Sequence, residues 1–123
     1  MTEKARVFRK RILVAEDDPA ARESLNVLLS IDRHTVIEAK NGWEALALFA
    51  KERFDLVIVD YVVPEMQGRD LALNIKRVAP SHPILLVTAY FEKLVDSNLP
   101  VDAVLSKPFG IDGLRQAIAK LLY

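Results

Sequence analysis

At 123 residues the chain has the length of one domain and can bury a core without disulfides, which its lack of cysteine rules out. Its 17 Lys and Arg residues balance its 17 Asp and Glu residues, so no net charge attracts nucleic acid or an anionic membrane. The apolar stretches are too short to span a membrane, and the charged first residues lack the apolar core of a signal peptide. We therefore expect a cytoplasmic protein, a single domain over residues 1–123, with no membrane partner and no direct nucleic-acid partner.

The chain opens with a basic segment, residues 1–10, which we expect to be a solvated arm. The first predicted strand covers residues 11–15 and leads into a run of acidic residues. Asp18 at the N-cap and Pro19 at the first helical position then predict the start of a helix. Leucines spaced three and four residues apart give that helix one apolar face.

A second strand, predicted at residues 35–38, precedes a second helix. Asn41 is followed three residues later by Glu44, and this pair resembles a capping box. The pair favours a helix start over a hairpin turn at this point. His34 and His82 fall in predicted turns, where we expect solvated side chains.

The second half of the chain repeats the alternation of strands and helices. Leu56 to Val59 form an unbroken apolar run that ends at Asp60, which is typical of a strand buried on both faces. The remaining predicted elements are a helix at 68–78, a strand at 84–87, a short helix within 91–99, a strand at 103–106 and a last helix carrying Leu114 and Ile118.

Apolar strands separated by amphipathic helices predict an α/β fold, in which a parallel sheet has helices on both faces. In such a sheet the carboxyl ends of the strands share one edge, where ligands bind. The side chains predicted at that edge are Glu16, Asp17, Asp60, Thr88 and Lys107. Each alone is explained equally well as a cap, a turn hydroxyl or a solvated ammonium, but together they form a candidate site.

Three carboxylates at one edge repel one another unless they share a cation. Because the candidate ligands are oxygen atoms, we expect that cation to be Mg²⁺. A magnesium site that also holds a hydroxyl and a lysine suits phosphoryl transfer. We expect Asp60 to be the nucleophile, forming an acyl phosphate, with Thr88 and Lys107 contacting the phosphoryl oxygens.

These residues lie in motifs that resemble the receiver domain of two-component response regulators, over essentially the whole chain. The motifs are ILVAEDDPAAR, EAKNGWEALALF, DLVIVDYVVPEMQG, ILLVTA and LSKPF. The resemblance is to receivers of the chemotaxis-regulator-like kind, and it implies a flavodoxin-like, doubly wound sheet of five parallel strands in the order 2-1-3-4-5.

The resemblance also implies a role for each residue of the motifs. Asp60 matches the phosphorylated aspartate. Glu16 and Asp17 match the acidic pair that holds Mg²⁺ together with Asp60, and the backbone carbonyl of Val62 matches a further metal ligand. These correspondences extend the magnesium site expected from the strand ends.

Further correspondences concern the switch between signalling states. Thr88 matches the switch hydroxyl, and Thr88, Ala89 and Lys107 form the implied phosphoryl-binding group. The family usually has a cis peptide before the proline of its lysine-proline pair, here Pro108. The implied mechanism is a population shift, in which the phosphoryl group favours one of two loop arrangements.

Three positions depart from the family pattern. Val104 stands where the family usually carries an aromatic ring that turns inward on phosphorylation, so a different relay is expected. Val62 and Tyr90 occupy positions that control the access of water to the phosphoryl group. Because both are bulky where polar groups would orient water, we expect a long-lived phosphoryl group.

The expected function is that of a phospho-accepting receiver which takes a phosphoryl group from a histidine kinase or histidine phosphotransfer protein. It would be no enzyme beyond its own phosphorylation and dephosphorylation, would signal through the face around residues 90–123, and would be a monomer or a phosphorylation-dependent dimer. Two alternatives stay open: an unphosphorylated docking module, and a receiver cut from a longer DNA-binding or enzymatic regulator. A haloacid-dehalogenase-type phosphatase is disfavoured because Val62 replaces its second aspartate, and an FMN binder because acids occupy its phosphate loop.

Overall fold

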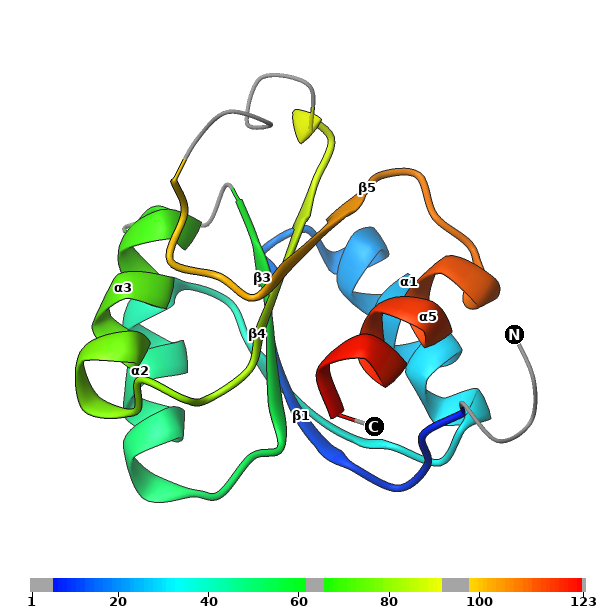
Figure 1. The fold of residues 1–123 in the computed structure, drawn as a ribbon, viewed down its shortest axis with the longest axis horizontal. Coiled ribbons are helices and arrows are strands. Elements are labelled where there is room, and N and C mark those ends of the chain that lie inside the picture. Colours follow the sequence, from blue (N-terminus) through cyan, green and yellow to red (C-terminus); the bar gives the residue numbers. More distant parts are fainter. Residues whose placement is uncertain (1–5, 62–65, 92–97, 123) are drawn as a thin grey trace.

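The computed structural model describes residues 6–61, 66–91 and 98–122. Five strands form one parallel sheet in the order β2-β1-β3-β4-β5 (Figure 1). The strands are β1 (Arg11–Ala15), β2 (Thr35–Ala39), β3 (Leu56–Asp60), β4 (Ile84–Thr88) and β5 (Ala103–Ser106). The predicted fold class and strand order are confirmed.

Four helices are found in the described residues: α1 (Pro19–Ile31), α2 (Gly42–Lys51), α3 (Gly68–Val78) and α5 (Ile111–Leu122). The short helix predicted within 91–99 falls mainly on residues 92–97, which lie outside the described part. No helix in the described part is both long enough and apolar enough to cross a membrane.

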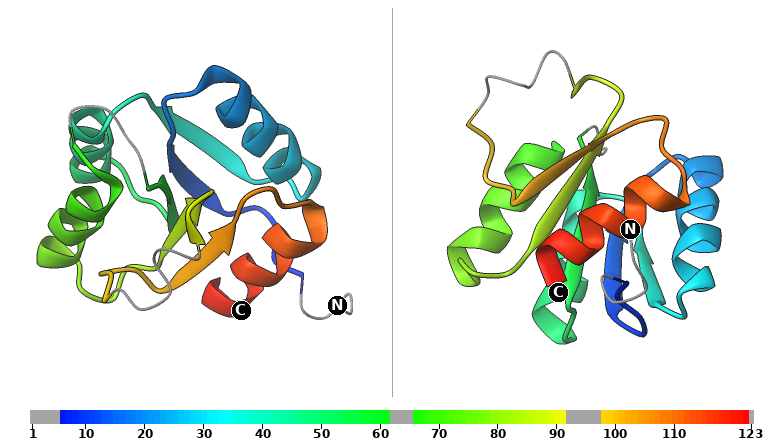
Figure 2. Two further views of the ribbon diagram at one scale, coloured as in Figure 1. Left: turned by 90° about the horizontal axis from the view of Figure 1, so that it is seen from above. Right: turned by 45° about the vertical axis from the view of Figure 1, so that its right-hand side comes forward.

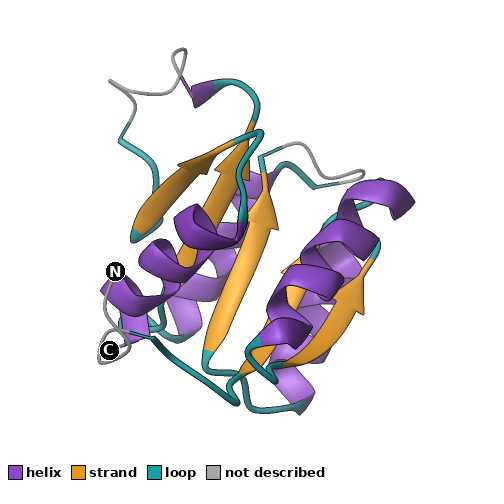
Figure 3. Cartoon of the chain, turned by 90° about the vertical axis from the view of Figure 1, so that its right-hand side faces the viewer, coloured by secondary structure: helices purple, strands orange, loops and turns teal. Residues whose placement is uncertain are grey.

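The helices cover both faces of the sheet (Figures 2 and 3). On β1, Leu13 and Ala15 face the core shared with α2 and α3, whereas Ile12 and Val14 face the core shared with α1 and α5. Strand side chains point alternately to the two faces, so both sets must be apolar to be buried. The continuous apolar runs in the sequence follow from this arrangement.

Side chains cap the first two helices as their sequences predicted. Asp18 accepts a hydrogen bond from the Ala21 amide at 3.1 Å, and Asn41 accepts one from the Glu44 amide at 2.8 Å. Each cap satisfies an amide that has no partner within its helix. The Asp18 cap fixes the turn between β1 and α1, which carries the first two acids of the candidate site.

The prediction of a solvated N-terminal arm is wrong for Arg6 and Val7, although Phe8 and Arg9 are exposed. Val7 is buried, and the Arg6 guanidinium donates to the Asp32 carboxylate at 2.7 Å. Arg115 of α5 donates to both oxygens of the same carboxylate, at 2.9 and 3.0 Å. Asp32 is buried and requires these positive partners, so the segment packs against the domain.

The prediction of solvated histidines is also wrong. His34 is buried, and its Nδ1 accepts a hydrogen bond from the Lys10 amide at 3.0 Å. The His82 ring stacks edge-on against Phe49, and its Nε2 lies 2.9 Å from the Phe54 carbonyl oxygen. Both histidines lie near the amino ends of strands, His34 before β2 and His82 before β4, and therefore at the opposite edge of the sheet from the candidate site.

Candidate functional site

The carboxyl ends of the strands bring the predicted side chains to one edge of the sheet, the upper edge in Figure 3. Asp60 is the last residue of β3 and Thr88 is the last residue of β4. Glu16 directly follows β1, and Lys107 directly follows β5. Parallel strand pairing therefore gathers residues that are far apart in the sequence, as predicted.

The Lys107 ammonium lies between two carboxylates. Its Nζ is 2.8 Å from Oδ2 of Asp60 and 3.0 Å from Oε1 of Glu16. Glu16 is 1% exposed, whereas the Asp60 side chain retains 13% of its exposure. Asp60 is thus the carboxylate of this pair that an incoming group can reach.

Burial and close contact change the protonation of this cluster. The pKa of Glu16 is raised to about 7, mainly by burial and secondly by its hydrogen bond with Asp60, although Lys107 opposes the rise. Burial alone would lower the pKa of Lys107, but its hydrogen bonds to Asp60 and Glu16 outweigh burial and raise it. Lys107 therefore remains a cation at neutral pH, while Glu16 can bind a proton there.

Asp17 is exposed at the turn after β1, beside the buried Glu16. Within the described ranges, no three acidic or histidine side chains are close enough together to hold a metal ion. Only two of the three expected carboxylates, those of Glu16 and Asp60, lie together around Lys107. The third, Asp17, is exposed at the surface. Val62, expected to add a carbonyl ligand, lies outside the described residues.

The residues at this edge nevertheless have the donor chemistry that Mg²⁺ prefers, since their side-chain ligands are oxygen atoms. Burial and, after it, the neighbouring Asp60 carboxylate disfavour the ionised form of Glu16 and raise its pKa. A divalent cation beside this pair would stabilise the ionised form of Glu16, and Asp17 adjoins the pair in the sequence. The oxygen donors of these side chains therefore fit the chemistry of Mg²⁺.

The Thr88 side chain is fully buried beside the site. Its Oγ1 accepts a hydrogen bond from the Tyr90 amide at 2.9 Å, which leaves the hydroxyl proton available for donation. The Lys107 amide donates to the Thr88 carbonyl at 2.8 Å, so the backbone of Lys107 is fixed to the end of β4. The peptide bond between Lys107 and Pro108 is cis.

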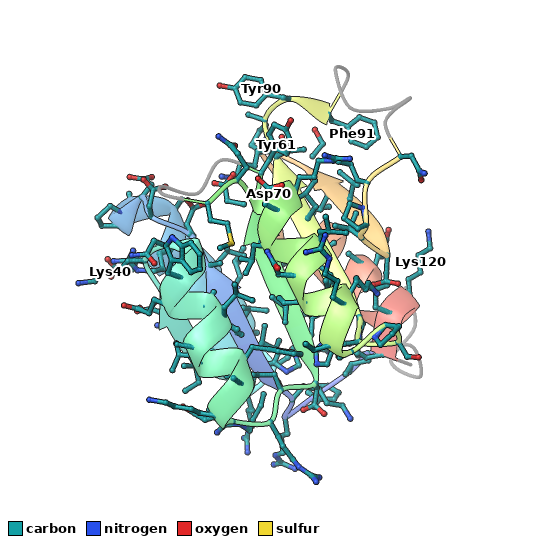
Figure 4. All side chains as sticks on the ribbon, turned by 90° about the vertical axis from the view of Figure 1, so that its left-hand side faces the viewer. Lys40, Tyr61, Asp70, Tyr90, Phe91 and Lys120 are labelled. Atoms are coloured by element: carbon teal, nitrogen blue, oxygen red, sulfur yellow. The ribbon has the colours of Figure 1, made fainter. Side chains whose placement is uncertain are left out.

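The positions that depart from the family pattern differ in exposure. Val104 is half-buried on β5, pairs with Leu86 and packs against the core shared with α2 and α3. Tyr90 is 49% exposed, and Figure 4 shows it at the same end of the molecule as Tyr61 and Phe91. The exposed aromatic side chains near the site, Tyr90 and Phe91, therefore follow β4. Val104 instead packs, half-buried, against the core.

An apolar groove of about 420 Å³ opens beside the cluster, between α1 and the loop that follows β5. Glu16 and Lys107 line the groove together with Leu25, Leu28 and Phe109. Ala89 also lines it, at an exposed position after Thr88. Glu16 and Lys107 therefore belong both to the carboxylate–lysine cluster and to the wall of this groove.

Gly68 begins α3 directly against the backbone of the nucleophile candidate. A Cβ atom at this position would contact the Asp60 carbonyl oxygen and would lie 2.9 Å from the Tyr61 carbonyl oxygen. We expect Gly68→Ala to lower the free energy of unfolding by about 1–3 kcal/mol, because backbone atoms must move to relieve the clash. Urea denaturation measures this change.

Gly113, within α5, provides the matched control. A Cβ atom there would make only an ordinary contact, 3.7 Å from a Leu105 methyl carbon. Gly113→Ala should therefore raise the free energy of unfolding by up to about 1 kcal/mol, because alanine favours the helix. Equal effects of the two substitutions would contradict the steric explanation.

Comparison with known proteins agrees with the geometry of the sheet edge. Residues 12–119 match the family model of the response regulator receiver domain. The chain belongs to this family. It is therefore a receiver domain of the kind found in the response regulators of two-component systems.

The receiver is related to longer regulators. It is 36% identical over 115 residues to the response regulator MprA of Mycolicibacterium vanbaalenii, covering 91% of this chain and 50% of that protein. MprA of Mycobacterium leprae is 34% identical over the same length and coverage. The receiver thus spans about half the length of the curated relatives it matches.

Solved structures share the fold along nearly the whole receiver. The response regulator TrrA of Thermotoga maritima, crystallised in complex with Mg²⁺ and BeF, superposes with a TM-score of 0.86 at 36% identity, covering 92% of this chain and 99% of that one. The chemotaxis response regulator CheY4 of Vibrio cholerae gives a TM-score of 0.83 at 26% identity, covering 94% and 100%. The flavodoxin-like arrangement is therefore shared with receivers of known structure.

Proposed function

We propose that this receiver accepts a phosphoryl group on Asp60 from a phosphohistidine of a histidine kinase or histidine phosphotransfer protein. The observation that carries the proposal is the contact of Lys107 Nζ with Asp60 at 2.8 Å and with Glu16 at 3.0 Å. A cation held beside an accessible carboxylate can neutralise phosphoryl oxygens as they approach. The family membership of the chain supports the same assignment.

In the proposed transfer, a carboxylate oxygen of Asp60 attacks the phosphorus atom. The new O–P bond forms as the P–N bond to the donor imidazole breaks, and the imidazole leaves with the electron pair of that bond. Lys107 then contacts the oxygens of the transferred group, and the Thr88 hydroxyl donates its proton to one of them. The Tyr90 amide, by donating to Thr88 Oγ1 at 2.9 Å, orients that hydroxyl.

We propose Mg²⁺ as the cofactor of this transfer, bound by Glu16, Asp17, Asp60 and the Val62 carbonyl. When bound, it neutralises charge on the phosphoryl oxygens. The all-oxygen donor set supports this choice. The Mg²⁺ in the crystallised TrrA complex supports it by analogy with a relative.

We propose that the signal leaves through the described part of the face around residues 90–123. Tyr90 and Phe91 are 49% and 39% exposed on the loop after β4, where a downstream protein partner can contact them. Half-buried Val104 cannot report the switch by burying an aromatic ring, so the change must pass through Thr88 and its loop. A phosphorylation-dependent dimer through this face is the alternative to a separate partner.

A small phosphodonor tests the function directly. We expect incubation with acetyl phosphate and Mg²⁺ to add one phosphoryl group to the wild-type chain, as measured by intact mass under mild conditions. Asp60→Asn should abolish the adduct, because an amide is a far weaker nucleophile at phosphorus than a carboxylate. Lack of an adduct on the wild type would favour the unphosphorylated docking module.

The same preparation measures the lifetime of the adduct. After the donor is removed, we expect slow loss of the phosphoryl group from the wild type and faster loss from Val62→Asn, whose polar side chain can orient water. Equal rates would contradict the proposed role of Val62 in limiting water access.

A further inference from the structure

Arg22 of α1 binds the backbone of both acidic residues at the end of β1. Its Nη1 donates to the Glu16 carbonyl at 2.9 Å and to the Asp17 carbonyl at 3.3 Å. Its Nε lies 3.7 Å from the Glu38 carboxylate of β2, and its side chain is 15% exposed. From these contacts we infer that Arg22 is a positioning residue that fixes the backbone from which Glu16 and Asp17 reach the proposed Mg²⁺, an inference that rests on the proposed function.

The position of Arg22 in its helix is electrostatically unfavourable by itself. It lies in the first turn of α1, where the positive end of the helix dipole repels a cation. The carbonyl groups of Glu16 and Asp17 and the nearby Glu38 compensate for this repulsion. A basic residue shortly after the acidic run was the only sign of this role in the sequence.

Arg22 holds the carbonyl side of the peptide between Asp17 and Asp18, whose amide side is held by the Glu16 carboxylate. Glu16 is fixed separately: its amide donates to Ala39 of β2, and its carboxylate contacts Lys107 and the Asp18 amide. Asp17 is exposed, and its carbonyl contacts the Arg22 guanidinium. Arg22 therefore restricts the peptide from which the Asp17 carboxylate must reach the cation.

Positioning and direct electrostatics make opposite predictions. If Arg22 acted only as a nearby positive charge, its removal would strengthen Mg²⁺ binding by removing a repulsive charge. If Arg22 holds the peptides, its removal makes the ligands more mobile and weakens binding. The direction of the change in Mg²⁺ affinity therefore separates the two effects.

The test is titration calorimetry of MgCl₂ into the unphosphorylated full chain. We expect Arg22→Ala to raise the Mg²⁺ dissociation constant about 10-fold. This value is the low end of the roughly 10–100-fold loss found when groups that orient metal ligands are removed. Arg22→Lys should raise it less, because an ammonium can still donate to a carbonyl. Arg77→Ala removes an exposed arginine from the C-terminal turn of α3, away from the site, and should leave the dissociation constant unchanged.

A urea denaturation curve without Mg²⁺ accompanies each variant, so that binding is compared only between folded proteins. Should Arg22→Ala not fold, Arg22→Met, which keeps an apolar stem but has no group that can donate to a carbonyl, takes its place, and an unchanged dissociation constant for it would overturn the inference. Unchanged or tighter binding by Arg22→Ala would also overturn it while leaving the proposed phosphorylation of Asp60 intact. A wild type that binds no Mg²⁺ would overturn both the inference and the proposed cofactor.

Discussion

Replacing Lys107 with methionine is expected to slow phosphoryl transfer to Asp60 by about 100-fold or more, the usual cost of removing one group that stabilises developing charge. The ammonium lies 2.8 Å from Asp60 and 3.0 Å from Glu16, so it is already placed to meet phosphoryl oxygens. Methionine keeps an unbranched apolar stem of nearly the same length but lacks the ammonium group. The rate is measured by intact mass at timed intervals with acetyl phosphate and saturating Mg²⁺.

The same substitution should change Mg²⁺ affinity in the opposite direction. Lys107 competes with a metal ion for the carboxylates of Glu16 and Asp60, so Lys107→Met should bind Mg²⁺ more tightly while accepting phosphate more slowly. Lys120→Met, at an exposed position of α5, makes the same chemical change away from the site and should alter neither quantity. A variant at Lys107 with the wild-type rate would remove the lysine from the proposed mechanism.

Replacing Asp32 with asparagine is expected to lower the free energy of unfolding by about 3 kcal/mol. Removing one partner of a buried ion pair costs roughly 3–5 kcal/mol, and the partial exposure of the arginines places this case at the low end. The Asp32 side chain is 4% exposed, and the Arg6 and Arg115 side chains are 22% and 19% exposed. Urea denaturation at neutral pH measures the loss.

The pH dependence of this loss of stability tests whether the ion pairs of Asp32 with Arg6 and Arg115 are its cause. Burial would raise the pKa of Asp32, but hydrogen bonds from Arg115 and Arg6 outweigh burial and lower it from 3.8. A lowered pKa in the folded state stabilises the protein above 3.8, and this stabilisation is lost as pH falls through the folded-state value. The difference in stability between wild type and Asp32→Asn should therefore shrink at acidic pH.

Glu23, an exposed acid on α1, the helix that ends next to Asp32, supplies the control. Glu23→Gln should change the free energy of unfolding by less than about 0.5 kcal/mol, as is usual for surface positions. Glu16 has the opposite pH dependence, since its raised pKa lowers stability as pH rises from 4.5 toward about 7. Comparing each variant with wild type at the same pH cancels this contribution. A pH-independent difference for Asp32→Asn would contradict the ion-pair explanation.

Much of the fold was predictable from local pattern. Apolar runs such as Leu56 to Val59 were long enough for strands, and Asp18 and Asn41 marked helix starts that the structure confirms. The strand order did not follow from the pattern, because the spacing of apolar residues does not specify which strands are neighbours. That order came from the family resemblance and is confirmed by the sheet.

The identity of the candidate site was also determined by the sequence. Glu16, Asp60, Thr88 and Lys107 each follow or end a predicted strand, and parallel strands share their carboxyl edge, so the chain order alone brings these residues together. Only the tertiary structure decided how they interact: Lys107 lies between Glu16 and Asp60, while Asp17 remains exposed. These details depend on side-chain directions and burial, which strand and helix patterns do not specify.

Two contacts between distant residues outside the site were decided by the tertiary structure alone. Asp32 and Arg115 are 83 positions apart, and His82 and Phe54 are 28 apart, yet each pair is in hydrogen-bond contact. The sequence marked these residues only as polar groups in turns or on helices. Whether such a group is solvated or buried depends on which elements pack beside it. The sequence by itself therefore determined the strands, most helices and the chemistry of the sheet edge. Packing between distant elements decided the ion pairs, the burial of His34 and the backbone contacts of Arg22.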